Sequence, residues 1–198
     1  MWVICYTYPM KTAIIVHGML SKKESENASL PPASQNHWLS WLQQELLKRG
    51  VAAETPNMPM PYNPDYQAWK KVFEKFSLDE NTILVGHSCG AGFIVRYLSE
   101  HSIRVGKVVL VAPWIDPRHV LPTGMFDFII DSHLATKTNG LTVFSSANDM
   151  PEINESIDML KSAIPNLHIV AFENKGHFCY GDMGTDAFPE LLTEALAN

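Results

Sequence analysis

The feature that most constrains the fold of this chain is a short apolar run that leads into a serine flanked by glycines. Residues 82–85, Thr-Ile-Leu-Val, are rich in β-branched side chains and follow the polar residues 79–81, as expected of a buried strand. Residues 86–90, Gly-His-Ser-Cys-Gly, come next, and small and apolar residues continue at helical spacing through Leu98. A strand, a glycine-flanked serine and a helix in direct succession predict the sharp turn called a nucleophile elbow.

Both glycines are expected to be required by the geometry of this turn. Residues two before and two after Ser88 face each other where the strand reverses into the helix, so side chains at Gly86 and Gly90 would collide. The turn places Ser88 at a helix N-terminus, where backbone N–H groups can stabilise a developing oxyanion. The alternatives are a plain tight turn and a glycine-rich phosphate loop. The second is disfavoured because the chain lacks its Gly-Lys-Ser/Thr ending and the G-x-G-x-x-G motif.

Length and composition favour one globular domain. The chain has 198 residues, of which 46% are hydrophobic, and a formal net charge of −6. A domain of this size can bury a substantial core, and a mildly acidic, ordinarily apolar chain favours neither disorder nor nucleic-acid binding. No apolar run approaches the length of a membrane span, so no membrane partner is expected.

The number and spacing of the cysteines indicate the cellular compartment and whether a zinc site is expected. Cys5, Cys89 and Cys179 are scattered and odd in number, which fits neither a disulfide framework nor a zinc site. A reducing compartment is therefore expected, and with it a cytoplasmic location. No metal and no other cofactor is predicted.

Residues 1–10 form a segment whose role the sequence leaves open. The segment has no basic leading residues, and its apolar part is too short for a secretory signal. It is either an edge strand or an extension that precedes an alternative start at Met10. The domain is expected over residues 11–198, with no repeat, linker or second domain.

Apolar runs and helical patterns alternate along the rest of the chain. Strands are expected at residues 11–16, 51–55, 82–85, 107–112, 141–146 and 167–172. Helices are expected at 36–47, 65–76, from the elbow through 98, at 151–162 and at 186–197. Loops are expected at 21–35 and in the proline-rich segment 56–64, and 117–139 is expected to be a mixed region with at most one short helix. This alternation implies crossover connections, and hence a mostly parallel sheet with helices on both faces.

Polar residues at the carboxyl ends of the strands are the candidate catalytic residues, because ligands of open parallel sheets bind there. Ser88 follows the third expected strand, Asp149 the fifth and His177 the sixth. The order Ser, Asp, His along the chain is that of α/β-hydrolases. We expect His177 to accept the Ser88 proton and Asp149 to orient His177.

Each of these assignments has an alternative. His177 could be a surface histidine, and Asp149 could be a solvated turn residue. Asp116 at the end of the preceding strand is the main alternative acid, and Asp131 and Asp182 are more remote. The remaining candidate histidines occupy a helix end, a strand interior or the segment 117–139; they are His101, His168, His119 and His133.

The first strand and the elbow are expected to supply two oxyanion donors. His17 and Gly18 follow the first strand, which places the backbone N–H of Met19 beside that of Cys89 in this architecture. His17 itself is expected to fix this loop, although its side chain also counts among the pocket candidates. The thiol of Cys89 is an alternative nucleophile, but its place in the first helical turn favours packing between sheet and helix.

Four pieces of the sequence together resemble the small serine hydrolases similar to retinoblastoma-binding protein nine and bacterial YdeN. They are Ile-Val-His-Gly at 15–18, Pro-Asn-Met-Pro at 56–59 with Trp69 downstream, the pentapeptide at 86–90, and Asn-Asp-Met-Pro at 148–151 with Gly176-His177. The proline-rich loop before a Trp-bearing helix is the most family-specific piece. The resemblance implies a minimal α/β-hydrolase fold without a large cap and a Ser–Asp–His triad. It leaves the substrate open between esters and amides, and it does not account for the extension at residues 1–9.

The segment between the fourth and fifth strands is too short to form a full lid, so a shallow groove is expected. The residues proposed to line it are His17, Met58, Met60, Tyr62, Trp114, Phe126 and Phe178. Ordinary packing is the alternative role for these side chains. Apolar and aromatic walls suit a small ester or an activated amide, and no fixed positive charge is evident that would bind a carboxylate or phosphate.

The sequence therefore predicts a serine hydrolase, carboxylesterase-like or aminopeptidase-like, that forms an acyl-enzyme on Ser88. One alternative is a protein-binding or scaffold protein that keeps the fold with weak or no catalysis. Another is an acyltransferase that uses the same triad. Retention of all three triad residues and both oxyanion positions favours the hydrolase. The expected partner is a small-molecule ester or amide, and no protein partner is indicated.

Overall fold

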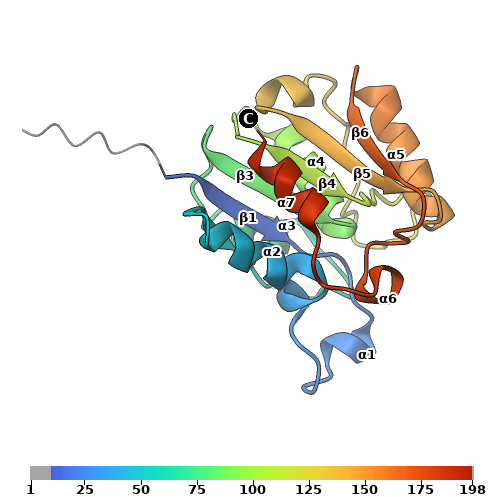
Figure 1. The fold of residues 1–198 in the computed structure, drawn as a ribbon. Coiled ribbons are helices and arrows are strands. Elements are labelled where there is room, and N and C mark those ends of the chain that lie inside the picture. The colour runs from blue at the N-terminus through green and yellow to red at the C-terminus, as the bar shows by residue number, and fades with distance from the viewer. Residues whose placement is uncertain (1–9, 198) are drawn as a thin grey trace, which may run out of the picture.

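Six parallel strands form the centre of the structure, a computed structural model that describes residues 10–197 (Figure 1). The segment 1–9, predicted to be an edge strand or an extension, lies outside the described residues. The strands are β1 (Thr12–Val16), β2 (Ala52–Glu54), β3 (Thr82–His87), β4 (Val108–Val111), β5 (Leu141–Ser146) and β6 (His168–Phe172). They lie in the order β2-β1-β3-β4-β5-β6, and every pair is parallel. The predicted parallel sheet is thus confirmed.

The central strands are buried throughout because helices cover both faces of the sheet. All six residues of β3 and all four of β4 are buried, as is typical of parallel sheets covered on both sides. In β6, at the edge, no residue is fully buried. The register pairs Gly86 with Val16 on one side and with Leu110 on the other, so the elbow begins between two neighbouring strand ends.

Five longer helices make the two outer layers. In Figure 1, α2 (Trp38–Leu47) and α7 (Pro189–Leu196) lie together in front of the sheet. The other layer contains α3 (Tyr66–Phe73), α4 (Cys89–Glu100) and α5 (Pro151–Ala163). Aromatic contacts join neighbours within each layer: Trp38 packs edge-on to Phe188, and Phe93 of α4 packs edge-on to Trp69 of α3.

The N-terminal end of α2 differs from the expectation. Residues 33–35 form a short 3₁₀ helix, η1 (Ala33–Gln35), so that Asn36 ends η1 instead of capping α2. His37, with φ of 53°, joins the two helices, and α2 begins at Trp38. The cap position of α2 is thus taken by His37, whose side chain makes no capping hydrogen bond.

Three other helix boundaries follow local chemistry. Asp65 is the cap of α3, because its carboxylate accepts a hydrogen bond from the Ala68 N–H at 2.8 Å, but the helix ends at Phe73 instead of continuing to 76. The C-terminal helix begins at Pro189 instead of 186, with proline in its first turn. The predicted helix at 151–162 is confirmed, one residue longer at its end.

Two short helices lie where no helix is predicted; they are α1 (Lys22–Ser25) and α6 (Tyr180–Met183). A third, η2 (Leu134–Lys137), lies in the segment 117–139, for which at most one short helix is expected. A capping box stabilises α1, in which Ser21 and Glu24 bond reciprocally to each other's backbone. Helices of three or four residues bury no apolar stripe of their own, so hydrophobic periodicity does not reveal them.

The two glycines of the elbow are required for different reasons. A Cβ on Gly86 would lie 2.5 Å from Cα of Ala91, so Gly86 faces the first turn of α4 as expected. A Cβ on Gly90 would instead overlap the carbonyl groups of Val16 and His17 at the end of β1. A Cβ on Gly86 would also lie 2.8 Å from the carbonyl carbon of Gly90, so the two glycines adjoin across the turn, but the nearest neighbours of a Cβ on Gly90 lie at the end of β1. Gly90 lets α4 lie directly against the neighbouring strand.

Replacement of Gly90 by alanine should destabilise the fold more than an ordinary glycine substitution. The new Cβ would meet backbone atoms, which cannot rotate away, so we expect Gly90→Ala to lower the free energy of unfolding by more than about 3 kcal/mol. Gly181→Ala is the matched control, because no atom lies within 4 Å of a Cβ built there. Urea denaturation of both variants and the parent measures the difference, and equal stabilities would contradict the packing described here.

Candidate active site

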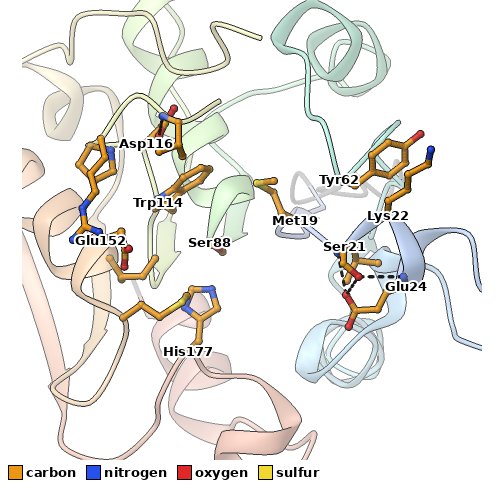
Figure 2. A pocket seen from close by; sticks show the side chains of 16 residues that line it. Met19, Ser21, Lys22, Glu24, Tyr62, Ser88, Trp114, Asp116, Glu152 and His177 are labelled. Atoms are coloured by element: carbon orange, nitrogen blue, oxygen red, sulfur yellow. Dashed lines mark hydrogen bonds and ion pairs between the residues drawn. The ribbon is translucent and has the colours of Figure 1, made fainter. Parts of the chain in front are cut away.

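Ser88 occupies the elbow in a backbone conformation that few residues other than glycine adopt. Its φ is 53° and its ψ is −120°, which is strained for a residue with a side chain. Hydrogen bonds to the Ser88 peptide hold this conformation: its N–H donates to Val111 O at 2.9 Å, and its carbonyl accepts from the N–H groups of Ala91, Gly92 and Trp114. The turn presents Ser88 to a surface groove that His177 also lines (Figure 2).

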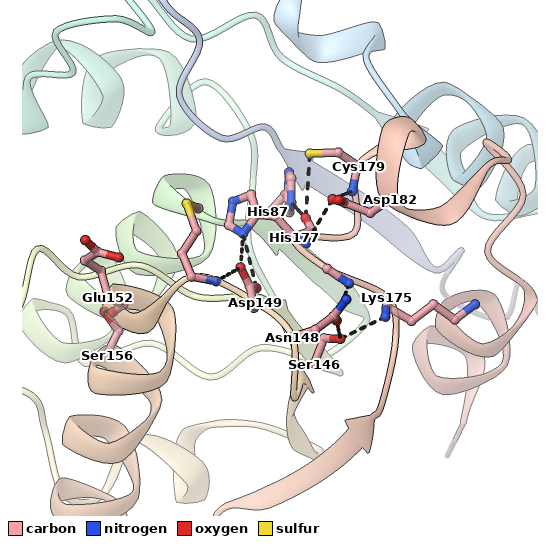
Figure 3. A network of polar contacts seen from close by, with 12 residues as sticks. His87, Ser146, Asn148, Asp149, Glu152, Ser156, Lys175, His177, Cys179 and Asp182 are labelled. Atoms are coloured by element: carbon pink, nitrogen blue, oxygen red, sulfur yellow. Dashed lines mark hydrogen bonds and ion pairs between the residues drawn. The ribbon is translucent and has the colours of Figure 1, made fainter.

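His177 and Asp149 meet at the same edge of the sheet, although they are 28 residues apart in sequence. Nδ1 of His177 lies 3.0 Å and 3.2 Å from the two carboxylate oxygens of Asp149 (Figure 3). The Asp149 side chain is fully covered, whereas 18% of the His177 side chain is exposed. A carboxylate on Nδ1 fixes the ring orientation and the tautomer, which leaves Nε2 as the free nitrogen.

The His177 peptide is held on both sides by side chains that the sequence analysis did not assign to the site. Its N–H donates to Oδ2 of Asp182 at 3.0 Å, and its carbonyl oxygen lies 2.8 Å from Nε2 of His87 (Figure 3). Just before it, the Gly176 N–H donates to Oδ1 of Asn148 at 2.8 Å. Asn148 adjoins Asp149 and His87 adjoins Ser88, so sequence adjacency was the available signal. Asp182 was considered only as an alternative acid.

Two buried histidines near the site are kept neutral. Burial is the largest cause that lowers the pKa of His17 to about 4, against an ordinary value of 6.5. Its Nδ1 lies 2.7 Å from Gly18 O, and its Nε2 accepts the Met58 N–H at 2.8 Å. Burial, with repulsion from His177, also holds the pKa of His87 well below its usual range. The His17 contacts support the expectation that this side chain fixes its loop.

The loop after β1 lies directly against the serine. A Cβ on Gly18 would lie 3.0 Å from Cβ of Ser88, so only glycine lets the loop approach so closely. Met19 follows and lines the groove together with Ser88. Cys89 is the first residue of α4, so its N–H is among the donors that a helix N-terminus leaves free.

The groove has a volume of about 1000 Å³ and is mostly apolar. Its lining residues come from three regions: the loop at 19–24 with Tyr62, the segment 114–120, and the beginning of α5. A second cavity of about 50 Å³ lies on the other side of Ser88 and His177, and it is lined partly by His17, His37 and His87.

The structure brings only some of the predicted pocket residues to the groove. Tyr62 and Trp114 line it, and His17 lines the smaller cavity instead. Met60 is half exposed but does not line the groove. The others belong to the hydrophobic core and cannot contact a ligand; they are Met58, Phe126 and Phe178. The alternative role, ordinary packing, applies to these three.

The core positions of these residues have clear causes. Phe126 packs edge-on against Trp114, with ring centroids 5.6 Å apart, and so supports the groove wall from behind. Phe178 stacks on Phe188 at 5.6 Å between the His177 loop and α7. Aromatic residues beside a site are as often its support as its surface, and sequence does not separate the two.

The alternative acids and the alternative nucleophile have other roles. The Asp116 carboxylate accepts hydrogen bonds from the Val120 and Leu121 N–H groups at 2.8 Å and 2.9 Å, and thereby closes its own loop. Asp131 forms an ion pair with Lys137 at 2.7 Å. Cys89 is fully buried, and burial strongly raises the pKa of its thiol. A buried thiol that stays protonated is a poor nucleophile.

Among residues 10–197, no group of three or more His, Cys, Asp or Glu side chains is arranged to hold a metal ion. Within the same range, no helix has the length and apolar character needed to cross a membrane.

A parallel sheet, a strained serine between β3 and α4, and a histidine–carboxylate pair at the same edge define an α/β-hydrolase fold. The serine hydrolase family matches residues 30–194, and the chain belongs to that family. It is similar to YdeN of Bacillus subtilis (strain 168), with 33% identity over 137 residues that span 61% of this chain and 72% of YdeN. The resemblance expected from sequence is thus confirmed.

Solved structures agree on the architecture. The crystal structure of the ydeN gene product from B. subtilis matches with a TM-score of 0.76 and 27% identity over 95% of this chain and all of that chain. Est1E from Butyrivibrio proteoclasticus matches with a TM-score of 0.58 and 16% identity, over 96% of this chain and 89% of Est1E. At that identity the second likeness concerns the fold alone.

Acidification should destabilise the protein partly through His17. The folded state keeps His17 neutral down to about pH 4, whereas the unfolded chain binds a proton near pH 6.5. Neutral His17 therefore contributes its full share of the free energy of unfolding above pH 6.5. That share falls by about 2–3 kcal/mol as the pH falls from 6.5 towards 4. Urea denaturation across this range should show the loss.

The variant His17→Gln isolates this contribution. Its amide oxygen can still accept the Met58 N–H but does not titrate, so the variant should start less stable and then lose less stability on acidification. His87 and the carboxylates titrate in both proteins and cancel in the difference. Parallel stability curves for variant and parent would contradict the assignment.

Proposed function

We propose that the protein hydrolyses small esters or activated amides through an acyl-enzyme on Ser88. The observation that carries this proposal is the contact of Nδ1 of His177 with the covered Asp149 carboxylate, 3.0 Å away, beside a groove that Ser88 also lines. A histidine oriented in this way can act as a base towards a serine hydroxyl. Membership of the serine hydrolase family supports the same chemistry.

In the proposed first step, Oγ of Ser88 attacks the substrate carbonyl carbon while Nε2 of His177 takes the hydroxyl proton. The tetrahedral intermediate collapses, the bond to the leaving group breaks, and His177 returns the proton to the leaving alcohol or amine. Water then attacks the acyl-enzyme with the same assistance and releases the acid and free Ser88. Asp149 remains ionised and stabilises the imidazolium in both steps.

The backbone N–H groups of Met19 and Cys89 are the proposed oxyanion donors. Removal of one such donor typically costs about 3 kcal/mol of transition-state stabilisation. The contact of Gly18 with Ser88 supports this role, because it holds the donor-bearing loop beside the nucleophile. Side chains bonded to the His177 peptide support precise placement of the base, since rotation of its peptide would break two hydrogen bonds.

Labelling with a fluorophosphonate probe tests the nucleophile. We expect one stoichiometric adduct on the parent protein by intact mass, and none on Ser88→Ala, because only an activated serine attacks phosphorus at a useful rate. Circular dichroism of the variant controls for folding. A well-folded parent that forms no adduct would contradict the proposal and favour a binding or scaffold role.

Substitution of the acid distinguishes Asp149 from Asp116. Asp149→Asn removes the charge that orients and stabilises protonated His177, and we expect kcat for a p-nitrophenyl ester to fall by about 10³–10⁴. Asp116→Asn keeps an acceptor for the loop, and we expect a loss below about tenfold. Steady-state kinetics at neutral pH measures both, and a larger effect at Asp116 would overturn the acid assignment.

A further inference from the structure

The groove beside Ser88 is larger and less polar than a short ester requires. Its volume of about 1000 Å³ is at the upper end of the usual range for small-molecule sites. Apolar residues line the groove from the loop after β1, from Tyr62, from the segment 114–120 and from the start of α5. Figure 2 labels Met19, Tyr62 and Trp114 among them, and the others are Leu20, Val120, Met150 and Ile153. Two of them are strongly exposed, Val120 at 67% and Met150 at 49%. Apolar side chains left in water around a reactive group mark a surface on which an apolar ligand can be buried.

The charged side chains of the groove are already engaged within the protein. Arg118 forms ion pairs with Glu152 at 2.6 Å and with Glu155 at 2.7 Å. On the opposite wall, Glu24 accepts the Ser21 N–H at 2.9 Å, and Lys22 lies 3.7 Å from Glu26.

The remaining charged residue of the groove, Asp116, is engaged in the same way, because its carboxylate accepts two backbone N–H groups. A charged substrate would have to compete for these partners, whereas a neutral one would not.

The loop that carries Val120 forms one wall of the groove, and side-chain contacts hold it at two points. The Asp116 carboxylate closes the loop by accepting the N–H groups of Val120 and Leu121. Arg118 connects the same loop to α5 through its two glutamate partners. Because the loop is already held in place, little conformational entropy of the loop is lost when a ligand binds against Val120.

We infer that the groove selects neutral esters that carry an extended apolar chain, and rejects esters whose chain ends in a charge. This inference rests on the proposed function and adds the substrate class. The chain lies against Trp114, Val120 and Met150, and its burial supplies the binding energy. Each methylene buried there can raise kcat/KM by up to about fourfold. A terminal carboxylate would be placed among groups that offer it no free positive charge.

Two series of neutral esters test the dependence on chain length. One varies the acyl chain of p-nitrophenyl esters from about two to ten carbons, and the other varies the alcohol of acetate esters over the same range. We expect kcat/KM to rise at least tenfold from the shortest to the best member in one series, which also shows which half of the substrate occupies the groove. A flat response in both series would overturn the inference while leaving the hydrolase proposal intact.

A matched pair of ligands tests the role of charge without requiring catalysis. Methyl octanoate and monomethyl suberate have the same chain length, and only the second ends in a carboxylate. We expect calorimetric titration of Ser88→Ala to show at least tenfold tighter binding of methyl octanoate. Equal binding, or tighter binding of the charged ester, would overturn the inference. Because Ser88→Ala performs no acyl transfer, this result is independent of the labelling experiment.

A charge placed on the groove wall should reverse part of the preference. Val120→Lys adds a positive charge at an exposed position, so it should weaken the binding of methyl octanoate and strengthen the binding of monomethyl suberate. The ratio of their dissociation constants should therefore narrow at least fivefold. Ile129→Lys is the control, because Ile129 is 90% exposed and does not line the groove. An unchanged ratio in Val120→Lys, or the same change in both variants, would place the binding site elsewhere.

Discussion

The close approach of the elbow to β1 is the constraint on which the rest of the site depends. Gly90 lets α4 lie against the carbonyl groups at the end of that strand, and Gly18 lets the following loop reach the β-carbon of Ser88. Ser88 itself remains in a strained conformation because its carbonyl accepts three N–H groups. Strain of this kind persists only where the surroundings determine it from several sides. Backbone packing thus aligns the serine with both proposed oxyanion donors.

The base is positioned by a second, polar set of contacts. His87 and Asp182 bond to the two sides of the His177 peptide, while Asn148 holds the residue before it. Nε2 of His87 donates to that carbonyl, and burial keeps the pKa of the ring well below its usual range. The elbow and the histidine loop are therefore linked directly, through a side chain next to the serine. This link gives one explanation for the histidine at position 87, the second residue of the elbow pentapeptide 86–90.

The groove combines apolar walls with charges that are already paired. The ion pairs of Arg118 are exposed and contribute little to stability, so their clearer consequence is geometric, since they fix the loop that bears Val120. The chain belongs to the serine hydrolase family, which supports hydrolase activity but leaves the substrate open. The distribution of paired charge and exposed apolar surface around Ser88 is the structural basis on which a substrate class can be assigned.

The sequence alone determined the parallel α/β architecture, since alternating apolar runs and helical patterns admit few arrangements. It also placed Ser88, Asp149 and His177 at one edge of the sheet, because the carboxyl ends of parallel strands lie at the same edge. It did not reveal α1 and α6, which bury no apolar stripe. It also did not reveal why Gly90 is required, because the carbonyl groups that a side chain there would meet belong to Val16 and His17, more than about 70 residues earlier. It also could not separate Tyr62 and Trp114, which line the groove, from Met58, Phe126 and Phe178, which are buried. Apolar side chains have the same character in a core and in a groove, and only tertiary packing decides which of them meets solvent.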